Sequence, residues 1–196
     1  MKEIDVIGWI LNSELLLSKT LTMIESQPDA KHKEQKVNIK NVSKSISDMK
    51  LYCFNSADIK ERLFPFFNHR MNAPKAPKDL NRFCDYILLV QHVNGLFVFF
   101  LEMKRGTKEG ADEQINASCT FFDFILESAE RIKKINNFSK FDKNQIYYRK
   151  IIIRECHSNK IFTKNNSVED MDFNSIITHN CTNEFRPIVY CKQNKL

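Results

Sequence analysis

The fold is decided by the stretch Asp85–Lys104, which reads DYILLVQHVNGLFVFFLEMK. It contains two runs rich in β-branched and aromatic residues, separated by the dipeptide Asn94-Gly95, which favours a two-residue turn. The sequence therefore predicts a β-hairpin. If the turn is centred on this dipeptide, Asp85 lies opposite Lys104 and diagonal to Glu102.

The charged ends of this hairpin form a candidate site. Strand alternation places Asp85, Glu102 and Lys104 on one face, within reach of a single cation or a single phosphate. Away from these charges both faces of the hairpin are apolar, which is typical of strands in the middle of a sheet that is covered on both sides.

Length and composition limit the class of protein. The 196 residues suit a single domain spanning residues 1–196, with a core over about 5–155 and an irregular C-terminal extension over about 156–196. The net charge of +6 fits a polyanionic partner, although it is also common in proteins without one. No stretch approaches the ~20 apolar residues that span a bilayer, and the N-terminus lacks a secretory pattern. We therefore expect a cytoplasmic protein that has no membrane contact.

Other chemistries find little support. The six cysteines include no CxxC pair and read as reduced, buried thiols. Cys156-His157, His179, Cys181 and Cys191 could in principle meet around zinc, but their spacing matches no zinc pattern. The four glycines give neither a phosphate-binding loop nor a dinucleotide fingerprint. No serine lies in a nucleophile-elbow motif.

Hydrophobic periodicity and turn residues divide the rest of the chain. A helix is predicted for 5–26, a solvated stretch or polar helix for 29–50, a strand for 51–54, a helix for 55–65, a loop for 68–82, strands for 84–91 and 96–104, a helix for 111–135, a strand for 146–154, an irregular segment for 158–184 and a last strand for 185–191.

Basic side chains flank the hairpin in sequence. The loop 68–82 runs directly into the first strand, so its cations are either part of a solvated linker or phosphate contacts beside the candidate site. The loop that follows the second strand adds two more cations. The predicted nucleic-acid-binding residues are Arg70, Lys75, Lys78, Arg82, Arg105 and Lys108.

The element order resembles that of a known superfamily. If the helix 55–65 is left aside, the predicted order is a helix, a strand, a strand with Asp85, a strand with Glu102-Met103-Lys104, a helix and a strand. This order is similar to that of the PD-(D/E)XK nucleases over about residues 5–155, and Cys84 stands where the family name has proline. The resemblance implies an α/β (α+β), restriction-endonuclease-like fold, in which a central mixed sheet is flanked by helices in an αβββαβ core.

The resemblance also implies a function, that of a metal-dependent nuclease in restriction or antiviral defence, with DNA favoured over RNA. Asp85 and Glu102 are hard oxygen ligands that suit Mg²⁺ or Mn²⁺, and the Met103 carbonyl is a further candidate ligand. The cation would activate the attacking water and neutralise charge on the phosphate. Lys104 would orient that water or stabilise the transition state.

Two more residues follow from the resemblance. Family members often add an acid from the first helix, and Glu14 lies in the same predicted apolar stripe as Ile10, where an acid requires a partner or a metal. Glu25 and Glu61 are alternatives. Gln114 looks like the glutamine that several nuclease subfamilies use near the active site, although a simple polar residue at a helix start is an equal interpretation.

Alternative functions remain open from the residues alone. Asp85 and Lys104 could form a cross-strand ion pair in a non-catalytic nucleic-acid-binding or assembly module. An RNA endonuclease, or an interaction subunit that docks a partner through residues 158–196, is also compatible. Double-strand cutting would favour a homodimer by two-fold symmetry, and a regulatory protein is a further expected partner.

Overall fold

A computed structural model describes residues 2–17, 21–25, 35–54, 83–104, 109–136, 142–155, 172, 174–181 and 184–192. Its elements in chain order are α1 (Glu3–Ile10), η1 (Ser13–Leu15), β1 (Thr22–Glu25), β2 (Gln35–Ile39), β3 (Ile46–Cys53), β4 (Tyr86–His92), β5 (Gly95–Lys104), α3 (Ala111–Asn136), η2 (Lys143–Gln145), β6 (Ile146–Glu155), β7 (Ile177–Cys181), β8 (Glu184–Phe185) and η4 (Pro187–Tyr190).

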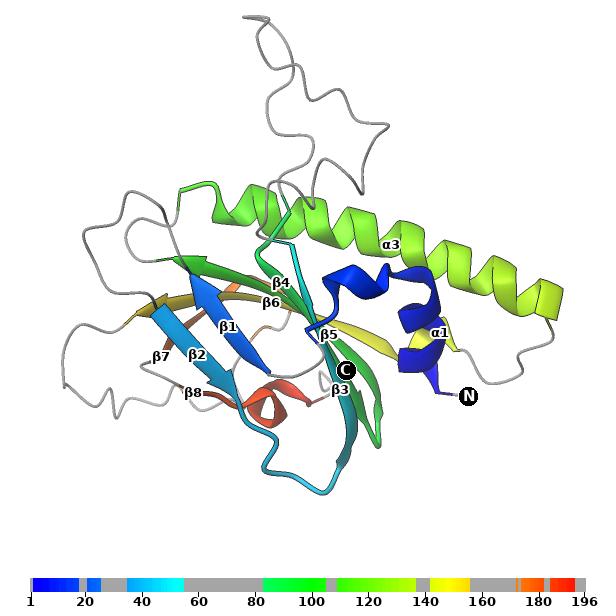
Figure 1. Cartoon of the computed structure of the whole chain (residues 1–196), viewed down its shortest axis with the longest axis horizontal. Coiled ribbons are helices and arrows are strands. Elements are labelled where there is room, and N and C mark those ends of the chain that lie inside the picture. The colour runs from blue at the N-terminus through cyan, green and yellow to red at the C-terminus, as the bar shows by residue number, and fades with distance from the viewer. Residues whose placement is uncertain are drawn as a thin grey trace, which may run out of the picture.

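The described residues form two mixed sheets and two α-helices (Figure 1). The larger sheet has the strand order β3-β4-β5-β6-β7, in which β3, β4 and β5 are antiparallel and β5, β6 and β7 are parallel. Helices α1 and α3 pack on one face of it. The smaller sheet, with the order β1-β2-β8, packs on the other. The chain is therefore a mixed α and β protein, and the prediction of a sheet covered on both sides is confirmed.

The central hairpin is buried on both faces because each face has its own apolar cover. Every residue of β4 and β5 is buried except Lys104, which is half-buried. Ile87, Leu89 and Phe100 pack against the helices, whereas Leu88 and Phe99 pack against the smaller sheet. Burial of this kind supplies most of the favourable free energy of folding.

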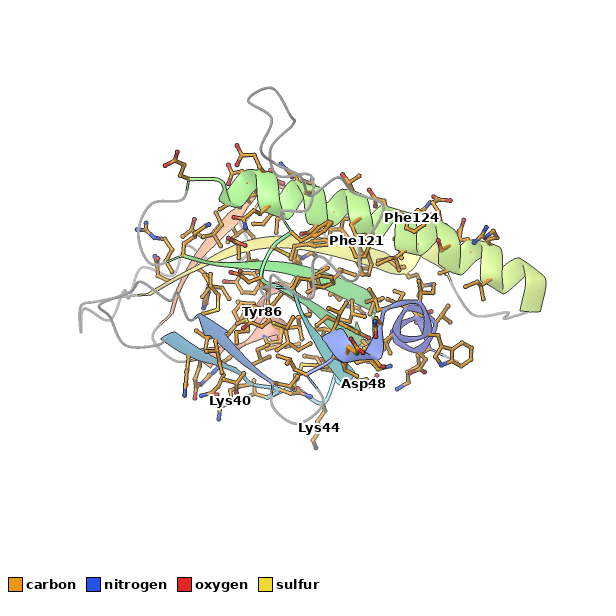
Figure 2. The ribbon with its side chains drawn as sticks, turned by 45° about the horizontal axis from the view of Figure 1, so that its top comes forward. Lys40, Lys44, Asp48, Tyr86, Phe121 and Phe124 are labelled. Carbon is orange, nitrogen blue, oxygen red and sulfur yellow. The ribbon has the colours of Figure 1, made fainter. Side chains whose placement is uncertain are left out.

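One tyrosine hydroxyl joins the two sheets (Figure 2). Tyr86 Oη donates to the Ile24 carbonyl over 2.7 Å and accepts from the Ile24 amide over 2.8 Å. A buried hydroxyl requires such partners. The start of β4 is thereby fixed to β1 from the side opposite the helices.

The hairpin register differs from the predicted one. Gly95 pairs with His92, and Tyr86 pairs with Leu101, so the turn consists of Val93-Asn94 rather than Asn94-Gly95. Continuing this register places Asp85 opposite Glu102, and the predicted pairing of Asp85 with Lys104 is wrong. The shift is an even number of residues, so each side chain keeps its predicted face.

The first position of β5 is suited to glycine, in agreement with the place of Gly95 in the strand rather than in the turn. Its φ is +130°, a value that L-residues rarely adopt, and a Cβ there would lie 2.3 Å from the Gln145 carbonyl oxygen. The sequence assigns Gly95 to the turn. In the structure a glycine is required at this position because β5 begins next to the residues that lead into β6.

Replacing Gly95 by alanine is expected to lower the free energy of unfolding by about 1–3 kcal/mol or more, from backbone strain and the backbone clash. Gly8→Ala in α1 is the matched control, because its Cβ would meet mainly the flexible end of Lys50. That variant is expected to be neutral or up to about 1 kcal/mol more stable. Urea denaturation measures both, and equal effects would contradict the argument.

The N-terminal prediction is wrong in its extent. The helix ends at Ile10 instead of 26, because Leu11 adopts an extended conformation and the Asn12 side chain accepts the Glu14 amide to start η1. The expected end of that helix is strand β1. The stretch 29–50, predicted to be solvated or helical, contains β2 and most of β3. Tertiary pairing of these strands overrides their weak local pattern.

The later elements agree better. The helix predicted for 111–135 and the strand predicted for 146–154 are confirmed as α3 and β6. The segment 158–184 is not irregular throughout, since it contains β7, which extends the larger sheet. The last predicted strand is a short β8 followed by η4. The predicted helix 55–65 and loop 68–82 lie outside the described residues.

The buried guanidinium of Arg149 attaches the C-terminal segment to the larger sheet. Its Nε donates to the Tyr190 carbonyl over 2.8 Å, its Nη2 donates to the Lys192 carbonyl, and the group lies over the Phe97 ring. Burial lowers the pKa of Arg149 to about 10. Main-chain acceptors therefore offset much of the cost of burying this charge.

Among the described residues, no helix is both long and apolar enough to cross a membrane.

Candidate active site at the ends of β4 and β5

Two acidic side chains and two main-chain amides hold each other where β4 begins and β5 ends. Asp85 Oδ2 accepts the Met103 amide over 2.8 Å. In return, Glu102 Oε2 accepts the Asp85 amide over 3.2 Å. Asp85 lies just before the first residue of β4. Its carboxylate therefore accepts the Met103 amide of β5, which lies beyond the paired residues of β4 and β5. This exchange fixes both carboxylates on the helix-covered face of the sheet.

Lys104 and Gln114 extend this arrangement to α3. Lys104 Nζ lies 2.8 Å from Glu102 Oε1 and donates to Gln114 Oε1 over 3.1 Å. Gln114 Nε2 in turn donates to the Phe83 carbonyl over 3.4 Å. The structure thus brings together the four side chains Asp85, Glu102, Lys104 and Gln114, and their catalytic role stays a prediction.

The electrostatic environment of Glu102 disfavours its ionised form. Glu102 is 2% exposed. Burial, followed by the charge of Asp85, raises its pKa to about 7, while Lys104 and the Asp85 amide act in the opposite direction. A raised pKa means that the ionised form is less stable here than in water. An added cation would relieve that cost.

Ser118 is a positioning residue that the sequence reasoning missed. Its fully buried Oγ accepts the Cys84 amide over 2.8 Å and donates to the Gln114 carbonyl over 2.9 Å. Ser118 therefore ties the residue before Asp85 to the helix that carries Gln114. The spacing in the sequence could have indicated this residue, since Ser118 lies four residues after Gln114, within the buried stripe that includes Ile115.

Removal of this hydroxyl tests the link. Ser118→Ala leaves the buried Cys84 amide without its acceptor and is expected to lower the free energy of unfolding by about 1–3 kcal/mol. Thr120→Ala is the matched control, because Thr120 makes the same bond to a preceding carbonyl, that of Asn116, on the exposed side of α3. Its effect should stay within about 0.5 kcal/mol. Similar losses in both variants would show that only helix propensity had changed.

The donor set fits a hard divalent cation. Carboxylates and carbonyl oxygens are the ligands that Mg²⁺ and Mn²⁺ prefer. A strand residue offers its N–H and C=O to the same neighbour. The Met103 carbonyl therefore leaves β5 on the same edge as the amide that bonds Asp85. The described residues hold no group of three or more His, Cys, Asp or Glu side chains that could bind a metal. Asp85 and Glu102 would thus need this carbonyl, water or substrate oxygens to complete the coordination.

Several predicted site residues fall elsewhere. Glu14 is exposed in η1, so its predicted place in a buried helical stripe is wrong, because the helix ends before it. Of the two alternative acids, the Glu25 side chain and the whole of Glu61 lie outside the described residues. So do all six predicted nucleic-acid contacts, Arg70, Lys75, Lys78, Arg82, Arg105 and Lys108, which remain predictions.

The zinc alternative gains no support from the ligands that the structure describes. His179 Nδ1 lies 2.6 Å from Tyr190 Oη, and its ring packs edge-on against Phe185. Burial lowers the pKa of His179 and raises that of Cys191 to about 12, as expected of core residues. Cys156 and His157 lie outside the described part of the chain.

Comparison with known proteins found no match to the chain among family models, curated proteins or solved structures. The fold and the site therefore define its class by themselves. It is a mixed α and β protein in which a buried and a half-buried acid and a lysine, at the ends of adjacent strands of the larger sheet, meet a glutamine of α3.

Proposed function

We propose that this protein is a divalent-metal-dependent nuclease that hydrolyses phosphodiester bonds, with DNA as the favoured substrate. The observation that supports this most is the convergence of Asp85, Glu102, Lys104 and Gln114 at one point. A buried carboxylate with a raised pKa, next to a second carboxylate and an ammonium, is a common arrangement of functional sites.

The order and pairing of the elements support the same proposal. Elements α1, β3, β4, β5, α3 and β6 follow the αβββαβ order of the restriction-endonuclease-like fold, with β1 and β2 inserted after α1. Strands β3 to β5 are antiparallel and β6 is parallel to β5, which gives a mixed central sheet. Helices α1 and α3 cover one face, and the smaller sheet covers the other.

The roles of the residues follow from their contacts. Asp85 and Glu102, with the Met103 carbonyl, would hold the cation, which when bound would activate the attacking water and neutralise charge on the phosphate. Lys104 would place its ammonium beside the reacting phosphate, because its present partner Oε1 belongs to a cation ligand. Gln114 would keep the Lys104 side chain directed at that point. Cation binding requires the deprotonated form of Glu102, so cation affinity should fall as the pH decreases below about 7.

Cleavage of defined substrates tests the proposal. The purified chain is incubated with supercoiled plasmid, linear duplex DNA, single-stranded DNA and RNA, in Mg²⁺, Mn²⁺ or EDTA. We expect cleavage with either cation, none in EDTA, and DNA as the preferred substrate. Preference for RNA would change the proposed substrate and keep the chemistry. Absence of cleavage on every substrate, together with absence of Mn²⁺ binding by calorimetry, would refute the proposal.

The 2.8 Å ion pair of Glu102 and Lys104 favours a second candidate function, a non-catalytic nucleic-acid-binding module. In that case Lys104 is the permanent partner of the buried acid and no cation replaces it. Such a module would bind nucleic acid with a steep salt dependence and leave it intact.

For the nuclease, restriction or antiviral defence is the setting that we propose, with a second copy or a regulatory protein as partner.

A further inference from the structure

We propose that Arg154 on β6, with Asn180 on β7 beside it, forms a phosphate-binding extension of the candidate site, and that the substrate is a chain bearing phosphates beyond the one that reacts. This inference rests on the proposed function and adds to it the residues that would contact a second phosphate of the substrate. Arg154 and Asn180 are here called the lateral row.

Strand register aligns the lateral row with Lys104. Lys104 pairs with Arg154 between β5 and β6, and Arg154 pairs with Asn180 between β6 and β7. Paired residues of neighbouring strands project from the same face of a sheet, and neighbouring strands are about 4.8 Å apart. Arg154 therefore lies beside Lys104 on the neighbouring strand, and Asn180 lies beside Arg154 on the strand after that.

The packing of β6 shows which face this is. Ile152 pairs with Glu102 and belongs to the apolar cluster beneath α1 and α3. Ile151 and Ile153 belong to the opposite cluster, beneath the smaller sheet. Arg154 lies two residues after Ile152, so it projects from the face that holds Glu102 and Lys104.

The lateral row also lies at the edge of the sheet where ligands usually bind. Strands β5, β6 and β7 are parallel, and all three reach their carboxyl ends at this level. Crevices outside the carboxyl ends of parallel strands are the common ligand sites of open sheets. Arg154 is half-buried and Asn180 is exposed, so both side chains reach solvent there.

The chemistry of the row suits phosphate. Arginine offers a planar fork of donors that matches phosphate oxygens, and an asparagine amide adds a neutral donor. Lys104 is already engaged with Glu102 and Gln114 at the reacting end. A cation one strand further away would contact a different phosphate of the same molecule. Such remote contacts contribute binding free energy that a single phosphodiester cannot supply.

The variant Arg154→Gln tests this inference, and Lys150→Gln is its matched control. Lys150 lies on the same strand and face, but it pairs with Phe100 and donates to the Asn116 side chain, away from the acid pair. The probes are a short fluorescein-labelled oligodeoxynucleotide and bis(p-nitrophenyl) phosphate, which has one phosphodiester. We expect Arg154→Gln to raise the KM for the oligonucleotide about tenfold and to reduce the salt slope of its binding by about one. Hydrolysis of the single phosphodiester should remain at the wild-type level.

The outcomes separate this inference from the proposed function. Equal losses in Arg154→Gln and Lys150→Gln would overturn it, since general positive charge would then explain both. A loss of single-phosphodiester hydrolysis in Arg154→Gln would also overturn it, because the residue would then act at the reacting phosphate or in folding. If the wild type cleaves neither probe, oligonucleotide binding measured by anisotropy in EDTA still decides. A reduced salt slope in Arg154→Gln alone supports the lateral row even though the nuclease proposal has failed.

Discussion

Replacing Lys104 by glutamine is expected to lower the rate of nucleic acid cleavage by about 10²–10³-fold while cation binding persists. The ammonium lies 2.8 Å from Glu102 Oε1, and glutamine can keep the contact with Gln114 but not the charge. Lys104 now occupies the Oε1 atom that a cation would bind. Its loss should therefore leave Mn²⁺ affinity unchanged or increase it. Single-turnover cleavage measures the first effect, and calorimetric titration with Mn²⁺ measures the second.

Lys50→Gln is the matched control for this variant. Lys50 is 24% exposed and pairs with Asp5 over 3.2 Å, whereas Lys104 is 22% exposed and pairs with Glu102 over 2.8 Å. Both variants remove a half-buried ammonium from an ion pair, but only Lys104 lies beside the acid pair. Wild-type cleavage in Lys104→Gln would exclude a catalytic role. Loss of Mn²⁺ binding in that variant would show that the lysine organises the site instead.

Glu102→Gln is expected to change the pH dependence of stability in the absence of divalent cations. The ordinary pKa of this carboxyl is 4.5, and burial together with Asp85 raises it to about 7 in the folded protein. Between these values the folded state binds more protons than the unfolded state, so raising the pH destabilises the wild type. The wild type should lose stability relative to Glu102→Gln by up to about 1.4 kcal/mol per pH unit from about pH 4.5 to 7, with no further change above.

Urea denaturation at a series of pH values in EDTA measures this difference. Glu113→Gln, which changes an exposed carboxyl in the first turn of α3, should follow the wild type at every pH. Addition of Mn²⁺ at pH 8 should stabilise the wild type and leave Glu102→Gln unaffected, because a cation that binds only the folded state raises its stability. A wild-type profile parallel to that of Glu102→Gln would show that the Glu102 carboxyl titrates normally.

Local sequence patterns predict some elements well and others poorly, and the difference has a physical origin. Helix α3 has a long, periodic apolar pattern, and strands β4, β5 and β6 are runs rich in β-branched and aromatic residues, so that each leaves one reasonable assignment. Strands β1 and β2 are short and polar, and they form because Met23, Val37 and Ile39 cover the far face of the larger sheet. Only tertiary pairing stabilises such strands, so their local sequence does not reveal them.

The candidate site was predictable for a related reason. The period of two in a strand fixes the face of each side chain, and this face survived although the register shifted. Asp85, Glu102 and Lys104 therefore lie together as expected, while their exact partners do not follow the prediction. Glu14 shows the opposite case, since its predicted burial depended on a helix that ends four residues earlier.

By itself, the sequence of this protein determined a buried hairpin, the face on which its charges lie and the long helix that follows, because these depend on periodicity within single segments. Only the tertiary structure decided that Asp85 lies opposite Glu102 rather than Lys104, since Gly95 is the first residue of β5 and the turn consists of Val93-Asn94. It alone brought Ser118 to Cys84 and aligned Arg154 with Lys104, because both relations depend on pairing between elements distant in sequence.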